Sequence, residues 1–222
     1  MTKNSPKRRW FQFRLRTLLI GVLVLSLPLS WFAWRMEKAR KQREAVEALQ
    51  STGIFLDWQI VRESEPGVPT WLAKLFGDSY LFVEVRQVIW NTQSNWKPVR
   101  DEHMIHLADL PDLRRIAVPT CRVSDVGVEH LKGLTNLRSL DLSRTEVTDD
   151  GLKHLKEMSE LQHLFLSGTQ ITDGGLEYLK GLANLKWLSL KGTQATPEGV
   201  QRLQEALPNC KIEYDETLAV MQ

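Results

Sequence analysis

The chain has 222 residues, of which 42% are hydrophobic and 25% charged, a composition that can bury a core. The formal net charge of +2 hides an uneven distribution. Residues 1–44 contain eleven of the 29 basic and two of the 27 acidic side chains, so the rest of the chain is net acidic. An acidic folded part lacks the basic face that neutralises phosphates, which argues against nucleic-acid binding.

A basic segment at residues 1–16 precedes an uncharged run of 18 residues, TLLIGVLVLSLPLSWFAW, at residues 17–34. As a helix this run would be about 27 Å long, close to the roughly 30 Å of a bilayer's hydrocarbon core. Aromatic side chains flank it on both sides, as is typical of the headgroup region. They are Trp10, Phe11, Phe13, Trp31, Phe32 and Trp34. The pattern predicts an uncleaved transmembrane signal-anchor.

A cleaved signal peptide is the alternative interpretation of this run, because it has the same basic start and apolar middle. Signal peptides have a shorter apolar run and small residues at the exit, whereas bulky rings crowd the exit at residues 30–34. Six basic residues before the run and five soon after it give a slight positive-inside bias. We therefore expect a single-pass membrane protein with its N-terminus in the cytoplasm and its folded part on the extracytoplasmic side.

Residues 35–53 are rich in helix formers and end at Gly53, which predicts a helix. It is either a rigid stalk that continues the membrane helix or an ordinary surface helix. Residues 54–112 predict an N-terminal cap, with a strand at residues 54–61, a Pro-Gly-Pro loop at residues 66–69 and a short helix at residues 71–76. This segment should cover the first open strand edge of the array that follows.

A period of 24 residues governs residues 113–212, where an LxxLxL stretch begins at Leu113, Leu137, Leu161 and Leu185. The alternation within this stretch predicts a short strand, and the recurrence predicts a solenoid. Eight residues after each starting Leu comes a residue that closes the turn, in order Cys121, Thr145, Thr169 and Thr193. Since the two cysteines, Cys121 and Cys210, fall at opposite ends of the array, no disulfide is expected.

A helix start follows each predicted strand. Ser124, Thr148, Thr172 and Thr196 stand at capping positions, followed by Asp125, Asp149, Asp173 and Pro197. Gly127, Gly151, Gly175 and Gly199 recur at the third helical position, where we infer that a neighbour leaves no room for a side chain. A degenerate first repeat is predicted upstream, with its strand at Val85, Val88 and Trp90, 28 residues before the next unit instead of 24, and with Arg100 at the capping position.

The pattern LxxLxLxxTxITDxGLxxLxxLxx resembles the leucine-rich-repeat family, particularly bacterial proteins in which the repeats follow an N-terminal membrane anchor. The resemblance implies a short α/β solenoid, with parallel strands on the concave face and helices on the convex face. Residues 207–212 are similar to the truncated last repeat of many members, and the tail at residues 213–222 shows no strong pattern.

The array contains no recognisable catalytic or metal-binding pattern. His103 and His106 form HxxH without further ligands at metal spacing. Helix capping explains the acidic groups around Asp149 without calcium. Asp141 and His163 fall on adjacent strands, but no positioned nucleophile accompanies them. We therefore predict a protein that is not an enzyme and needs no metal or cofactor.

The outward positions of the strands predict a binding surface for a protein or peptide. Its residues are Arg115, Asp141, His163, Phe165, Trp187, Ser189 and Lys191. Phe165 and Trp187 are the informative members, because a large apolar side chain at an outward position gains nothing unless something covers it. The cover is either a partner or the chain itself, through its C-terminal segment or through lateral packing between strands.

The sequence therefore favours a membrane-tethered protein-protein interaction module. A structural, self-associating cell-envelope scaffold is the alternative. A third hypothesis, the recognition subunit of an enzyme complex such as a ubiquitin-ligase adaptor, is disfavoured because a membrane segment precedes the repeats instead of an adaptor-type helical box.

Overall fold

A parallel sheet of six strands forms one layer of the molecule. The computed structural model describes residues 26, 30–31, 33–49, 60–61, 84–89 and 99–215. In chain order, which is also the order in the sheet, the strands are β3 (Gln87–Ile89), β4 (Arg115–Ala117), β5 (Ser139–Asp141), β6 (His163–Phe165), β7 (Trp187–Ser189) and β8 (Lys211–Glu213). Their parallel arrangement confirms the predicted α/β solenoid.

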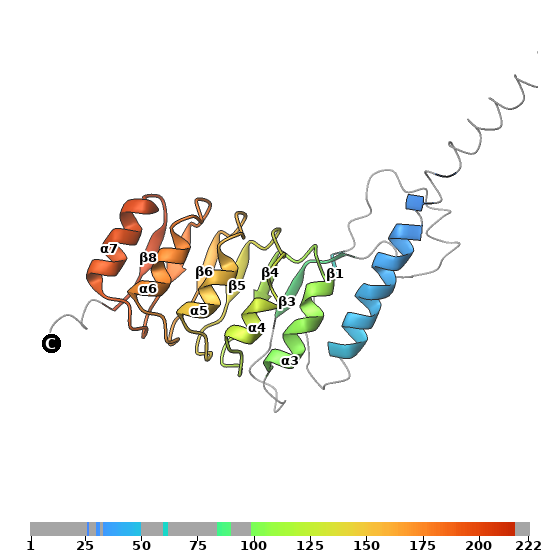
Figure 1. Cartoon of the computed structure of the whole chain (residues 1–222), viewed down its shortest axis with the longest axis horizontal. Coiled ribbons are helices and arrows are strands. Elements are labelled where there is room, and N and C mark those ends of the chain that lie inside the picture. Colours follow the sequence, from blue (N-terminus) through green and yellow to red (C-terminus); the bar gives the residue numbers. More distant parts are fainter. Residues whose placement is uncertain are drawn as a thin grey trace, which may run out of the picture.

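Short helices form the second layer, one group following each strand from β3 to β7 (Figure 1). They are α3 (Asp101–Met104) with the 3₁₀ turn η2 (Ile105–Asp109), α4 (Asp125–Glu129), α5 (Asp149–Leu152) with η3 (Lys153–Leu155), α6 (Asp173–Leu176) with η4 (Glu177–Leu179), and α7 (Pro197–Ala206). Each repeat is thus a strand, a turn and a helix, as the period predicts. We call the side of the sheet away from the helices its open face.

The register of the sheet follows the sequence period. Arg115 lies opposite Ser139, Ser139 opposite His163, and His163 opposite Trp187, each 24 residues further along the chain. Between β3 and β4 the offset is 28 residues, because Gln87 lies opposite Arg115. β3 thus pairs with β4 at the 28-residue offset expected for a degenerate first repeat.

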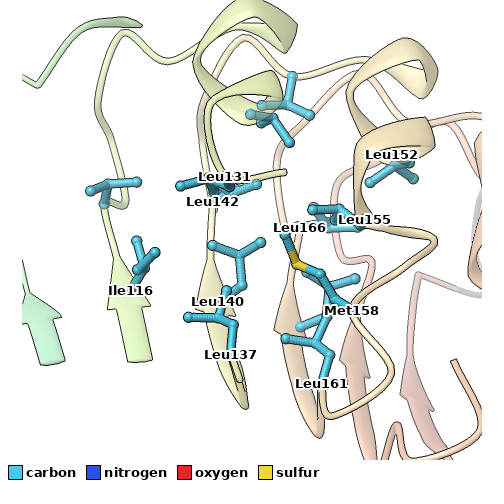
Figure 2. Close-up of a cluster of buried hydrophobic side chains, with 14 of the residues drawn as sticks. Ile116, Leu131, Leu137, Leu140, Leu142, Leu152, Leu155, Met158, Leu161 and Leu166 are labelled. Atoms are coloured by element: carbon cyan, nitrogen blue, oxygen red, sulfur yellow. The ribbon is translucent and has the colours of Figure 1, made fainter. Parts of the chain in front are cut away.

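Leucine side chains fill the space between the two layers (Figure 2). Leu137, Leu140 and Leu142 of one repeat lie beside Leu161 and Leu166 of the next, and all five are fully buried. Full burial of such a side chain contributes about 1.5–3 kcal/mol. Because each repeat covers the apolar face of its neighbour, the core runs continuously along the array.

The predicted helix caps are confirmed. In α4, α5, α6 and α7 the hydroxyl oxygens of Ser124, Thr148, Thr172 and Thr196 accept hydrogen bonds from backbone N–H groups in the first helical turn. Pro197 occupies the first turn of α7, where its missing N–H costs nothing. At α3 the cap is Arg100, whose backbone N–H donates instead to Nδ1 of His103 at 2.9 Å.

In every repeat before the last, the aspartate after the cap binds the next repeat, a contact that the sequence analysis did not anticipate. Asp149 accepts hydrogen bonds from the backbone N–H and the hydroxyl of Thr172, at 2.8 and 2.5 Å. The same pair of bonds joins Asp101 to Ser124, Asp125 to Thr148 and Asp173 to Thr196. We call these four carboxylates the aspartate ladder.

The ladder also explains the recurring glycines. A Cβ at Gly151 would lie 2.6 Å from Oδ1 of Asp125 and 2.9 Å from the Val147 side chain. At the equivalent glycine of each other repeat, an added Cβ would meet the ladder carboxylate of the preceding repeat in the same way. The inference that a neighbour leaves no room for a side chain is confirmed, and the neighbour is the ladder aspartate.

The segment predicted as a stalk is helical at residues 33–49, and this helix packs against the first repeat. Ala45, Val46 and Leu49 are buried in the same cluster as the leucines of the array, and Nζ of Lys38 lies 2.6 Å from the Asp112 carboxylate. Figure 1 shows the helix beside α3. It thus covers the open end of the core instead of standing free.

Little of the remaining N-terminal region belongs to the described residues. β1 (Ile60–Val61) pairs antiparallel with β2 (Glu84–Val85). β1 lies in the segment predicted as a strand at residues 54–61, and β2 begins one residue before the strand predicted at Val85, Val88 and Trp90. The predicted Pro-Gly-Pro loop and the short helix at residues 71–76 lie outside the described residues, as does most of the predicted anchor at residues 17–34. No helix among the residues described has the length and hydropathy to cross a membrane.

The C-terminal end closes with β8, which pairs parallel with β7 and extends to Glu213. The side-chain amide of Gln204 donates to the carbonyl oxygens of Leu207 and Cys210, which holds the turn between α7 and β8. Asp215 accepts a hydrogen bond from the backbone N–H of Gly192 at 2.7 Å. The truncated last repeat is therefore a strand that completes the sheet, and residues 216–222 of the predicted tail lie outside the described residues.

Candidate functional site

The predicted site residues lie in lateral rows on the open face. Because the strands pair in register, Arg115, His163 and Trp187 belong to one row, which Lys211 continues on β8. Asp141, Phe165, Ser189 and Glu213 belong to the next row. In β5 and β6 the central residue is buried between the layers, whereas its two neighbours are partly exposed. The sheet thus brings the predicted residues to one surface.

Phe165 and Trp187 lie diagonally on adjacent strands, and both rings are half-buried. Nζ of Lys211 lies 4.3 Å from the centroid of the Trp187 ring, so a cation from the terminal strand covers part of it. The C-terminal segment therefore contributes some cover for Trp187, as one of the two interpretations expected. Both rings keep exposed surface that a partner could contact.

Polar contacts fix the residues around the two rings. Oδ1 of Asp141 accepts the backbone N–H of Ser143 at 2.9 Å, which shapes the turn after β5. The hydroxyl groups of Ser189 and Ser167 lie 2.8 Å apart. Ser189 is only 6% exposed, so it offers a partner little surface. Asp141 lies opposite Phe165 and not opposite His163, which places the carboxylate and the imidazole on diagonal positions.

Charged groups lie at both ends of this surface. The exposed Lys191 pairs with Glu213 at 3.2 Å, and Glu213 also lies 3.8 Å from Nζ of Lys211. Arg115 is exposed on the first complete repeat. The site is therefore a polar surface with two aromatic side chains near its centre.

A row of basic residues lies beside these positions, and the sequence analysis did not single it out. Arg114, Arg138 and Lys186 each directly precede a strand residue of the first row, and all three side chains are exposed. The available signal was the period itself, since each of the three directly follows the starting Leu of a repeat.

His103 and the two cysteines are at least partly buried, and none of them forms a reactive site. Partial burial lowers the pKa of His103, and its Nδ1 is occupied by the Arg100 backbone. Within the described ranges, no group of three potential metal ligands occurs. Cys121 and Cys210 are free and buried, and burial raises the pKa of each thiol to about 11. Both thiols therefore stay protonated at neutral pH and are poor nucleophiles.

Comparison with known proteins identifies the class. A family model described as leucine rich repeat matches residues 111–171 and, in an overlapping second match, residues 135–194. Residues 111–194 of the chain thus match the leucine-rich-repeat family. No curated protein matches the sequence.

Several solved structures are similar to parts of the chain. An internalin from Listeria monocytogenes has 28% identity and a TM-score of 0.44, over 50% of this chain and 30% of its own. Internalin C2 of the same organism has 22% identity and a TM-score of 0.43, over 53% and 52%. The leucine-rich-repeat ectodomain of the receptor kinase SOBIR1 from Arabidopsis thaliana has 13% identity and a TM-score of 0.47, over 79% and 91%. The match thus spans about half or less of the two internalins.

Proposed function

We propose that this chain is a membrane-tethered interaction module that binds a protein or peptide through the open face of its sheet and performs no catalysis. Leucine-rich repeats commonly mediate protein-protein interaction, and the array offers a continuous sheet surface for it. The observation that carries the proposal is the pair Phe165 and Trp187, which are partly exposed among polar residues. Aromatic side chains in such a setting are the usual centres of binding energy at interfaces.

The anchor at residues 17–34 is part of this proposal. The ring of Trp31 is 47% exposed and that of Trp34 59%, at the start of the helix that packs on the array. Arg35 lies over Trp31 at 5.6 Å, and Lys38 over Trp34 at 5.7 Å. Exposed tryptophans paired with cations suit the headgroup region of a bilayer, next to a spanning segment.

The second candidate is a self-associating scaffold of the cell envelope. Within the described part of the chain, the outer edge of β8 has no strand paired to it. An open edge presents backbone donors and acceptors that a second copy could pair with. Sedimentation of the full-length chain in detergent distinguishes the two: large homo-oligomers would support the scaffold, and a monomer would support the interaction module.

The interaction module is tested by replacing both aromatic side chains. The double variant Phe165→Ser/Trp187→Ser should lose its cross-linked partner in native membranes, because the centre of the interface is removed. The matched control is Ile105→Ser/Val126→Ser, which removes two exposed apolar side chains outside the sheet, 49% and 58% exposed. Unchanged cross-linking in the aromatic variant, at an unchanged melting temperature, would refute the site.

Membrane orientation needs its own experiment. If the array lies outside the cytoplasm, protease added to cells or spheroplasts with intact inner membranes should digest it, while a cytoplasmic marker protein survives. Protection of the array until the membrane is permeabilised would contradict the proposed orientation.

A further inference from the structure

Five basic side chains line one margin of the open face. We call Arg114, Arg115, Arg138, Lys186 and Lys211 the basic rim. All five are exposed and stand at the N-terminal ends of β4, β5, β7 and β8, whereas Gln162 occupies the equivalent place before β6. Backbone hydrogen bonds link neighbouring members: Arg138 N–H donates to the carbonyl of Arg114, and Lys211 N–H to that of Lys186, both at 2.8 Å. The rim is thus fixed to the sheet.

Most of the rim lacks a counter-charge. Within the described residues, Arg114, Arg115, Arg138 and Lys186 form no ion pair. Nζ of Lys211 lies over the Trp187 ring and 3.8 Å from the Glu213 carboxylate, which pairs more closely with Lys191, at 3.2 Å. Like charges that follow one another across a sheet repel, and the chain beyond residue 44 is net acidic. A basic row therefore stands out from the general composition of this domain.

We propose that the basic rim binds an acidic, extended segment of a partner protein, with carboxylates on the rim and an apolar side chain against Trp187. This inference rests on the proposed function, because the rim borders the same face. Arginine favours this ligand, since its guanidinium group binds a carboxylate through two parallel hydrogen bonds. Trp187 with Lys211 above it places an apolar contact beside the cations.

The length of the rim sets the size of the ligand. Adjacent strands lie about 4.8 Å apart, so the four intervals from β4 to β8 span about 19 Å. An extended peptide rises about 3.3 Å per residue, so about six residues would cover this distance. A single chain also fits the charge pattern better than a bilayer or a duplex, whose broad array of phosphates would meet Asp141 and Glu213 on the adjoining row.

The test uses the full-length chain in non-ionic detergent and a fluorescent peptide of Asp and Glu residues around one central Leu. Fluorescence anisotropy measures its affinity for the wild type and for Arg114→Gln/Arg138→Gln. We expect the variant to bind about threefold to tenfold more weakly, because two exposed charge pairs are lost. Rising salt should weaken wild-type binding for the same reason.

The matched control is Lys132→Gln/Lys156→Gln, which makes the same change of charge at exposed positions after α4 and η3 on the helical side. It should leave the affinity unchanged. No binding of the acidic peptide, equal binding of its Asn and Gln counterpart, or equal weakening by the control would overturn the inference. Stronger competition by anionic lipid in mixed micelles of the same detergent than by unlabelled peptide would also overturn it in favour of a membrane surface.

Failure of this inference can be distinguished from failure of the proposed function. If the rim variant keeps the partner that is cross-linked in native membranes while Phe165→Ser/Trp187→Ser loses it, the proposed face stands and the acidic ligand is refuted. If the aromatic variant keeps that partner, the proposed face itself is refuted, whatever the peptide does.

Discussion

The inner repeats and the last repeat each begin their helix on a capping hydroxyl side chain, but they differ in the residue that follows the cap. In α4, α5 and α6 an aspartate follows the cap, and its carboxylate binds the cap of the next repeat. In α7 the residue in that place is Pro197, and no helix of the described chain follows to be bound. The aspartate is therefore needed for a contact between repeats, and its role in its own helix is secondary.

The two ends of the array are completed by different means. At the C-terminal end, α7 has ten residues where the inner α-helices have four or five, and β8 adds a strand. At the N-terminal end, the helix of residues 33–49 covers the core with its own apolar side chains. A regular ladder holds the middle of the array, whereas individual contacts hold each end.

The largest effect is expected from breaking the ladder in the middle of the array. Asp149→Ala removes both hydrogen bonds to Thr172 and should lower the free energy of unfolding by about 2–3 kcal/mol. Asp150→Ala is the matched control, because this neighbouring exposed aspartate pairs only with Lys153 and should cost less than about 1 kcal/mol. Denaturant unfolding measures both. Equal losses would show that the ladder does not hold the repeats together.

A smaller effect is expected from crowding the ladder without removing it. Gly151→Ala places a Cβ against Asp125 and Val147, which should destabilise the chain by about 1–2 kcal/mol despite the better helix propensity of alanine. Gly181→Ala is the control, since a Cβ there has no atom within 4 Å. Thermal unfolding should separate the two variants. A Gly151→Ala protein as stable as the wild type would mean that the carboxylate moves aside at little cost.

The sequence predicted the array well because its information is periodic. The 24-residue spacing sets which residues lie opposite each other, and the observed pairing of Ser139 with His163 follows from it directly. The ladder was not predicted, because an aspartate in the first turn already has a local explanation in the helix dipole. Its acceptor role toward Thr172, 23 residues later, depends on side-chain direction, which the period does not specify.

The sequence was enough to predict which rows of the sheet hold the candidate site residues, but not which side chains contact them. The alternation of inward and outward residues predicted the rows that contain Phe165 and Trp187, and the strand register has both residues in those rows. The cover of Trp187 by Lys211 depended on β8 joining the sheet in register, and that strand belongs to a truncated repeat. The packing of the helix at residues 33–49 was not predictable either, since its apolar side chains are few and their burial depends on the first repeat.

The N-terminal end should respond weakly to a single change of charge. Lys38→Gln removes the ion pair with Asp112, in which both side chains are about a quarter exposed. Stability should fall by about 0.5–1 kcal/mol at low salt and by less at high salt, because screening weakens such pairs. Lys41→Gln, an exposed neighbour on the same helix, is the control. An equal response of both variants in urea unfolding would show that this pair does not help to hold the helix on the array.

The smallest effect is expected where the ladder ends. Pro197→Asp restores the residue found after the caps of the inner repeats, but within the described chain no further cap is present to donate to it. The gain from a charge at the helix N-terminus and the loss of proline's fixed backbone should nearly cancel, leaving a change within about 0.5 kcal/mol. The same unfolding measurement compares it with Asp149→Ala. A clear stabilisation would mean that this aspartate acts mainly within its own helix, and the ladder would then be a consequence of capping instead of its reason.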